Sequence, residues 1–184
     1  MALGAFAALA SFALFHLVTV FPLSWILLYS KQSVSEFLAI QVFGAMLGAA
    51  GIVASGLIAD RIGRRRTVGA FAILIAVFSG FAPTLLDGGT LGQDVFILLG
   101  FILLGLSYGQ AAGAMNVNFE ARYRYVGAAL TADLAWLFGA GFAPLVALGL
   151  SANFGLGYVS LYLLSGALCT LGALSVDFAR QQRD

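Results

Sequence analysis

Six long apolar segments, separated by short polar stretches, make up most of the chain. They cover about residues 4–29, 37–59, 68–86, 95–117, 126–150 and 156–176. A helix that crosses about 30 Å of hydrocarbon needs about 20 mostly apolar residues, and each segment is about that long. Strands of a membrane barrel alternate polar and apolar side chains over about 10 residues, whereas these segments are apolar throughout. The pattern therefore predicts an all-α membrane protein with six transmembrane helices in a single bundle over residues 1–184.

Short polar stretches predict where the chain turns between these segments. The first segment is predicted to be a membrane span rather than a signal peptide, because no basic residue precedes it and its apolar run is too long. The stretch 151–153 is predicted to be a tight connection, and 177–184 a polar tail. The other predicted breaks are a turn near 31–35, a charge cluster at 60–66, a turn at 87–89 and a polar stretch at 118–125.

Composition supports a membrane protein and excludes several other classes. Hydrophobic residues make up 61% of the 184 positions and charged residues 9%, whereas a soluble domain carries about 25% charged residues. This excludes a disordered chain and a nucleic-acid binder. Cys169 is the one cysteine and His16 the one histidine, so neither an intrachain disulfide nor a zinc site is possible. We expect no metal, no cofactor and no nucleic-acid partner.

The basic residues predict the orientation in the membrane. If the stretch at 60–66 lies in the cytoplasm, eight of the nine basic residues lie on that side and Lys31 alone lies outside. This distribution obeys the positive-inside rule and predicts that both chain termini are cytoplasmic. The basic residues on the predicted inner side are Arg61, Arg64, Arg65, Arg66, Arg122, Arg124, Arg180 and Arg183.

Glycines at helical spacing predict how two of the spans pack. Such stripes let helix backbones approach closely, which drives association where lipid supplies no hydrophobic force between helices. The stripes are Gly105, Gly109 and Gly113 on the fourth span, and Gly44, Gly48, Gly51 and Ser55 on the second. In the fifth span, Gly139, Gly141 and Pro144 predict a bend.

The most specific run of the sequence is residues 56–66, Gly-Leu-Ile-Ala-Asp-Arg-Ile-Gly-Arg-Arg-Arg, here called the signature loop. We expect Gly56 to allow a tight helix contact, and Asp60 to cap a helix or pair with an arginine. We expect Gly63 to permit the turn and the arginines to anchor it in the cytoplasm. The residues that carry the pattern are Gly56, Asp60, Arg61, Gly63, Arg64 and Arg65.

This run resembles the signature loop of the major facilitator superfamily, which joins the second and third helices of each six-helix half. Residues 119–130 resemble the loop between helices ten and eleven of the metabolite:proton symporter branch, with Glu120 in place of the usual proline. The stretch 139–144 resembles that branch's eleventh helix. The resemblance implies that the chain is the C-terminal half of a twelve-helix transporter, whose substrate path lies between two halves. It then needs a second half or self-association, or else is a truncated fragment.

Polar side chains inside the spans are candidates for a substrate or proton path, because such groups are expensive in hydrocarbon. Asp133 lies about two turns into the fifth span and His16 near the middle of the first. Gln110 and Asn116 lie on the fourth span and are suited to hydrogen-bond a polar metabolite. The resemblance implies that the first and fourth helices line the path. A purely structural hydrogen bond remains the alternative for each of these four residues.

Arg122 and Arg124 are candidates to hold a carboxylate at the inner mouth of such a path, with anchoring to the membrane surface as the alternative. We expect a secondary transporter of a bacterial inner membrane, multi-pass and embedded in lipid, that couples protons to a small organic acid by alternating access. The alternative is a non-transporting fragment or assembly subunit. An intramembrane enzyme is not expected, since His16 precedes every plausible serine nucleophile.

Overall fold

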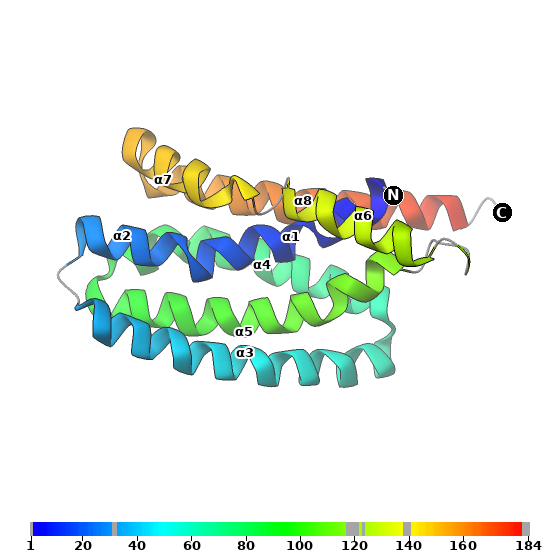
Figure 1. Cartoon of the computed structure of the whole chain (residues 1–184), viewed down its shortest axis with the longest axis horizontal. Coiled ribbons are helices and arrows are strands. Elements are labelled where there is room, and N and C mark those ends of the chain that lie inside the picture. Colours follow the sequence, from blue (N-terminus) through cyan, green and yellow to red (C-terminus); the bar gives the residue numbers. More distant parts are fainter. Residues whose placement is uncertain (1, 31–32, 117–121, 123, 138–140, 182–184) are drawn as a thin grey trace.

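The computed structural model describes residues 2–30, 33–116, 122, 124–137 and 141–181. Within these residues the chain is built from helices that run along a common long axis (Figure 1). The elements are α1 (Ala2–Thr19), α2 (Phe21–Tyr29), α3 (Val34–Ile62), α4 (Arg64–Asp87), α5 (Gly89–Asn116), α6 (Arg124–Trp136), α7 (Ala143–Phe154) and α8 (Leu156–Gln181).

Five described segments are long and apolar enough to cross a membrane. They are Phe6–Tyr29, Val34–Ile62, Arg64–Asp87, Gly89–Ala111 and Leu156–Val176, and Ala143–Phe154 is a shorter apolar helix. The all-helical architecture predicted from the sequence is therefore confirmed for the described residues. Several helices extend beyond the predicted spans, because polar residues at their ends continue the helix; α8 runs to Gln181, into the predicted polar tail.

The first predicted span is divided into α1 and α2 at Val20, a break that the sequence pattern did not predict. Pro22 lies in the first turn of α2 and has no N–H to donate to the preceding turn. The side-chain amide of Gln41 on α3 donates instead to the carbonyls of Val18 (3.2 Å) and Thr19 (2.9 Å). The break is thus stabilised by a hydrogen-bond donor from a neighbouring helix.

The segment predicted as the fifth span contains two described helices, α6 and α7, and the bend predicted between them falls at residues 138–140, outside the described part of the structure. Gly141 precedes α7, Pro144 lies in its first turn, and Gly139 lies outside the described residues. The predicted tight connection at 151–153 is wrong, because α7 continues through it to Phe154. The turn into α8 instead occurs at Gly155, whose φ of 91° is in the left-handed region that favours glycine.

The closest helix contact joins α3 to α5 along the predicted glycine stripes. A Cβ added at Gly105 would overlap the backbone of Gly48, at 2.7 Å from its carbonyl carbon. A Cβ at Gly109 would lie 2.5 Å from the Ser55 hydroxyl oxygen. The small-residue packing predicted from the sequence is therefore confirmed for these residues, whereas the side-chain surroundings of Gly113 lie outside the described part. We call this contact the glycine seam.

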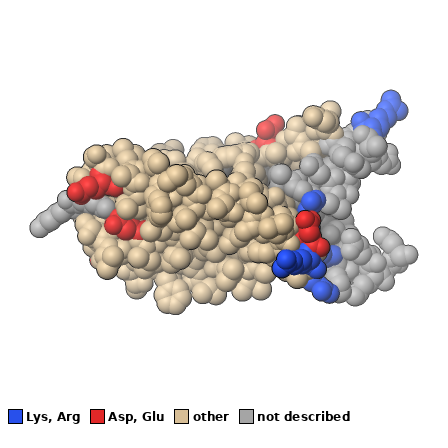
Figure 2. Space-filling view, turned by 90° about the horizontal axis from the view of Figure 1, so that it is seen from below, with Lys and Arg blue, Asp and Glu red and all other residues tan. Residues whose placement is uncertain are grey.

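Side chains of α1, α4, α5 and α8 form the main apolar core beside the seam. Its fully buried members include Leu14, Leu17, Ile75, Ile97 and Leu163. The start of α1, the end of α8 and the turn between α3 and α4 lie at one end of the bundle (Figure 1). In Figure 2, Arg side chains gather at that end, where acidic atoms also lie, and further acidic side chains lie at the opposite end. The acidic residues at the opposite end, next to the α2–α3 and α4–α5 connections, are Glu36, Asp87 and Asp94.

The seam predicts a sharp difference between glycine substitutions. Gly105→Ala should destabilise the folded chain by about 1–3 kcal/mol, since the added methyl group must displace the backbone of α3. Gly172→Ala on α8 is the matched control, because an added Cβ there has no heavy atom within 4 Å. The measurement is the thermal unfolding midpoint of each variant in the same detergent. Equal midpoints for the two variants would contradict the close approach of α3 and α5.

Candidate functional site

The signature loop forms the end of α3, a one-residue turn and the start of α4. Gly63 has a φ of 89°, and its N–H donates to the carbonyl of Ala59 at 2.9 Å. The Gly63 carbonyl accepts from the backbone N–H (3.1 Å) and the hydroxyl (2.9 Å) of Thr67. Gly63 therefore permits the turn, as predicted, and Thr67 fixes the start of α4.

Arginines of this turn have different surroundings. Arg65 is partly buried, and its guanidinium donates to the carbonyl of Leu174 on α8, which ties the signature loop to the last helix. Arg61 and Arg64 are exposed. The turn thus combines one structural arginine with a basic surface.

Two other members of the signature loop do not make the contacts expected from the sequence. Asp60 is exposed and, among the residues that the structure describes, has neither a hydrogen-bond nor an ion-pair partner. Gly56 faces open space, with no heavy atom of the described residues within 4 Å of an added Cβ, so the tight contact expected there is not made within the described part of the chain. The turn accordingly presents Asp60 and Gly56 outward.

His16 lies in a cluster of aromatic rings contributed by three helices. Its ring centroid is 5.2 Å from that of Phe15 on α1 and 5.8 Å from that of Trp136 on α6, both edge-on. Phe12 packs against Trp136 at 4.9 Å and against Tyr108 of α5 at 5.8 Å. We call these five residues the aromatic box.

The Nδ1 atom of His16 is buried and has no hydrogen-bond partner among the described residues. Buried polar atoms in folded proteins are nearly always paired, so an exception requires a reason such as a catalytic role or a missing ligand. The structural alternative for this histidine is a hydrogen bond to Ser11, Thr19 or a backbone carbonyl, and Nδ1 makes none of these among the described residues; the Thr19 hydroxyl donates to the Phe15 carbonyl at 2.7 Å. The imidazole is therefore able to accept a proton or to bond a ligand.

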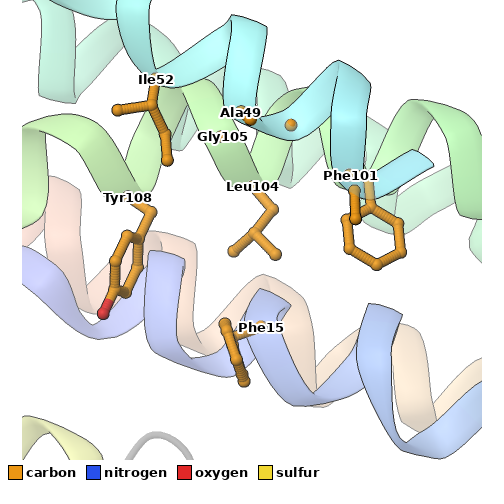
Figure 3. Close-up of a pocket in the computed structure, with 9 residues that line it drawn as sticks. Phe15, Ala49, Ile52, Phe101, Leu104, Gly105 and Tyr108 are labelled. Atoms are coloured by element: carbon orange, nitrogen blue, oxygen red, sulfur yellow. The ribbon is translucent and has the colours of Figure 1, made fainter. Parts of the chain in front are cut away.

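An apolar groove of about 230 Å³ lies between α1, α3 and α5, next to the aromatic box. Figure 3 shows Phe15 from α1 and Ile52 from α3 at its sides, while Tyr108 extends from α5 toward α1. Gly48 and Gly105 of the glycine seam also line it. The same small residues that bring α3 and α5 together thus leave room for the groove.

Gln110 is buried near the end of α5 and contacts the second span. Its side-chain amide donates to the Ser55 hydroxyl at 3.1 Å, and that hydroxyl donates to the Ile52 carbonyl at 2.8 Å. Gln110 is 4% exposed and Ser55 0%. The structure therefore shows the helix-tying contact that was one of its two predicted roles.

Asp133 is exposed on the outer side of α6, whereas Thr131 and Trp136 of the same helix turn toward the bundle. Among the described residues it has no hydrogen-bond or ion-pair partner. Its neighbours on that face are apolar, and include Leu130, Leu134 and Leu137. The carboxylate is therefore not part of the aromatic box, and it faces away from the interior of this bundle.

The remaining predicted site residues lie at the ends of α5 and α6. Asn116 is the last residue of α5 and Arg124 the first of α6, and the side chains of both lie outside the described part of the structure. Arg122 is exposed between them. The connection from α5 to α6, which contains Arg122, lies at the end of the bundle that also carries the turn between α3 and α4 (Figure 1).

Sequence reasoning identified His16 but missed the aromatic residues around it. Phe12, Phe15 and Tyr108 lie on the first and fourth spans, and Trp136 at the last residue of α6. One signal for them is present in the sequence, since Trp136 stands three residues before Gly139 of the glycine-containing stretch. In helices that are apolar on every side, however, no hydrophobic stripe marks the inward face.

Comparison with known proteins finds similarity over nearly the whole chain. The inner membrane metabolite transport protein YhjE of Escherichia coli (strain K12) is 36% identical over 183 residues, which are 94% of this chain and 40% of YhjE. Two proteins of Haemophilus influenzae (strain ATCC 51907 / DSM 11121 / KW20 / Rd), also named metabolite transport proteins, are 34% and 30% identical over 94% and 95% of this chain.

The chain spans about two fifths of the length of these relatives. No family model matches the sequence, and no solved structure matches it. Similarity at this level over almost every residue, together with apolar helices long enough to span a bilayer, identifies an integral membrane protein. The names of these relatives agree with the resemblance drawn from the signature loop: over nearly its whole length, the chain is similar to metabolite transport proteins.

Proposed function

We propose that the chain forms the C-terminal six-helix half of a major facilitator transporter in a bacterial inner membrane. In this proposal it moves a small organic acid or a related metabolite together with protons. The observation that carries the proposal is the similarity over 94% of the chain to a protein named as an inner membrane metabolite transport protein. The concentration of Arg side chains at one end of the bundle supports an orientation with that end in the cytoplasm (Figure 2).

In the proposed transporter, the aromatic box and the adjoining groove form this half's part of the substrate path. Helices α1 and α5 carry most of the box, and they correspond to the first and fourth spans that line the path in the resembled family. His16 is the proposed proton carrier, because its Nδ1 is unpaired and histidine changes charge near neutral pH. Bulky aromatic walls would contact the apolar part of a metabolite and exclude water from the imidazole.

A second bundle is proposed to cover the face that carries the groove and Asp133. A charged carboxylate at the centre of a spanning helix costs about 2.5–3.5 kcal/mol on insertion scales. Asp133 has no partner among the described residues of this chain, so contact with a polar group of another half, or of a second copy, would remove that cost. The large exposed side chains of α3, such as Phe43, Met46 and Val53, would face the partner or lipid.

Alternating access would then occur as this half and its partner rock about the path. The stretch 139–144, which contains two glycines and Pro144 and follows Trp136 in the sequence, is proposed to absorb part of that motion. A movement of α6 would then reach His16 through the contact between its ring and that of Trp136. The alternative is a non-transporting membrane fragment or assembly subunit.

Uptake into vesicles separates these two functions. The chain is reconstituted by itself, at a density that permits self-association, and in parallel with any membrane polypeptide that co-purifies with it. A pH gradient, acid outside, should drive accumulation of one member of a panel of carboxylates and zwitterions, and a protonophore should abolish that accumulation. Absence of uptake in both preparations, with helix content intact by circular dichroism, would favour the fragment.

Replacement of His16 tests the proposed proton carrier. His16→Gln keeps a polar side chain of similar reach but cannot take up a proton, so pH-gradient-driven uptake should fall by about 10²-fold or more. Exchange of labelled for unlabelled substrate at equal pH should persist, because it requires no net proton movement.

Two further variants sharpen this experiment. Asn153→Ala is a matched control on the exposed end of α7, where the amide bonds only its own helix, and it should leave both activities unchanged. If Asp133→Asn loses pH-gradient-driven uptake and His16→Gln does not, the carboxylate of Asp133 carries the proton instead. Parallel loss of driven uptake and exchange in His16→Gln would contradict a specific role in proton coupling.

A further inference from the structure

A second cavity, of about 480 Å³, lies at the end of the bundle opposite the signature loop. Three helix ends meet there: the end of α2, the end of α4 and the start of α5. In contrast to the central groove it has many polar groups in its wall. The side chains that matter for its chemistry are Trp25, Tyr29, Ser30, Asp87, Thr90 and Gln93.

Two hydrogen bonds of the Gln93 side chain hold the walls of the cavity in place. Gln93 is 5% exposed, and its amide nitrogen donates to the Leu86 carbonyl at 3.1 Å. Its amide oxygen accepts from the Ser30 hydroxyl at 2.9 Å. These two bonds tie the end of α2 to the turn between α4 and α5, so the walls of the cavity are held at a defined spacing.

One wall is aromatic. The rings of Trp25 and Tyr29, one turn apart on α2, lie 4.3 Å apart between centroids at an interplanar angle of 34°. Trp25 is half-buried, whereas Tyr29 is 57% exposed and its ring is accessible from the cavity mouth. The faces of Trp and Tyr rings attract cations through their quadrupoles.

The opposite wall carries the charge. Asp87 is exposed and has no hydrogen-bond or ion-pair partner among the residues that the structure describes. The C-terminal ends of α2 and α4 also point to the cavity, against one N-terminal end, that of α5, so the helix dipoles leave a net negative potential. Glu36 and Asp94 lie at the same end of the molecule, where Figure 2 shows acidic side chains.

From this arrangement we propose that the cavity binds a primary ammonium group. The ammonium would donate to the Asp87 carboxylate and to the hydroxyl oxygens of Ser30 and Thr90, while its positive charge lies against the Tyr29 and Trp25 rings. Three N–H donors suit this set of acceptors better than a quaternary ammonium, which has none. An anion would meet the Asp87 carboxylate and is disfavoured.

The position of the cavity at the end of the spans allows two sources for the same chemistry. One is the ethanolamine headgroup of a lipid in the facing leaflet, and the other is a free amine from the aqueous phase. Binding in this cavity does not require transport, so the binding proposal can be tested independently of the proposed function.

Fluorescence of Trp25 tests the site directly. The sequence has 2 tryptophans, so Trp136→Phe leaves Trp25 as the single reporter. Purified chain in phosphatidylcholine nanodiscs is titrated with ethanolamine, with tetramethylammonium and with acetate. In a second arm, phosphatidylethanolamine replaces part of the phosphatidylcholine. We expect a saturable response to ethanolamine, to the ethanolamine lipid or to both, and the responding arm identifies the source.

Charge-neutralising variants decide whether the response comes from this cavity. Asp87→Asn should weaken ammonium binding by about tenfold or more, because a charge-assisted hydrogen bond is lost. Glu36→Gln removes a carboxylate from the same end outside the cavity wall and should leave the affinity unchanged. The titration is repeated with Lys31→Gln, since the ammonium of that neighbouring residue is a potential competitor.

Three results would overturn the proposal. The first is the absence of a saturable response, both with Lys31 present and with Lys31→Gln. The second is an equal response in Asp87→Asn and Glu36→Gln. The third is a stronger response to acetate or tetramethylammonium than to ethanolamine. Far-ultraviolet circular dichroism of each variant shows whether helix content is retained. Binding of ethanolamine that depends on Asp87, either with Lys31 present or with Lys31→Gln, supports the site.

Discussion

The backbone contact between α3 and α5 at Gly48 and Gly105 is the constraint on which the rest of the bundle depends. In lipid, helices gain no hydrophobic free energy by leaving the solvent, so close van der Waals packing must hold them together. Any side chain at Gly105 would overlap the backbone of Gly48, which means that this approach is available to glycine alone. The Gln110–Ser55 hydrogen bond then fixes the two helices against sliding at the end of the same seam that is nearer the signature loop.

The seam positions the site as well as the fold. With α3 and α5 in backbone contact, α1 packs across α5, and Phe15 and Tyr108 meet beside the groove. His16 is held among aromatic rings that offer its Nδ1 no hydrogen bond, and Trp136 of α6 packs against it. A polar atom held unpaired by well-packed neighbours is available to a proton or a ligand, and Phe15 and Tyr108 of the box that holds it also line the groove.

The sequence predicted the helices and the seam well because both leave local signals. Long apolar runs define spans, and glycines four residues apart mark a contact face even where every side of the helix is apolar. The break at Val20 depends on Gln41 of α3 capping the carbonyls released near Pro22, a contact that no local pattern shows. Similarly, His16 was recognisable as a polar residue in a span, but its aromatic neighbours come from α5 and α6 and are brought together only by packing. The outward direction of Asp133 also depends on how α6 rotates against α1, which its sequence does not encode by itself.

Oxidative cross-linking across the seam tests the central claim most directly. Ser55→Cys and Gly109→Cys are introduced with Cys169→Ala, so that the pair is the sole source of thiols. An added Cβ at position 109 lies 2.5 Å from the Ser55 hydroxyl oxygen, the atom that the cysteine sulfur would replace. The two positions are therefore close enough for a disulfide, which requires a Cβ–Cβ spacing of about 3.5–4.5 Å. The structure predicts rapid intramolecular cross-linking in native membranes, and none for the pair Gly56→Cys with Gly172→Cys, whose positions both face open space. Failure of the first pair to cross-link, or equal cross-linking of both pairs, would contradict the seam and the arrangement of the site that rests on it.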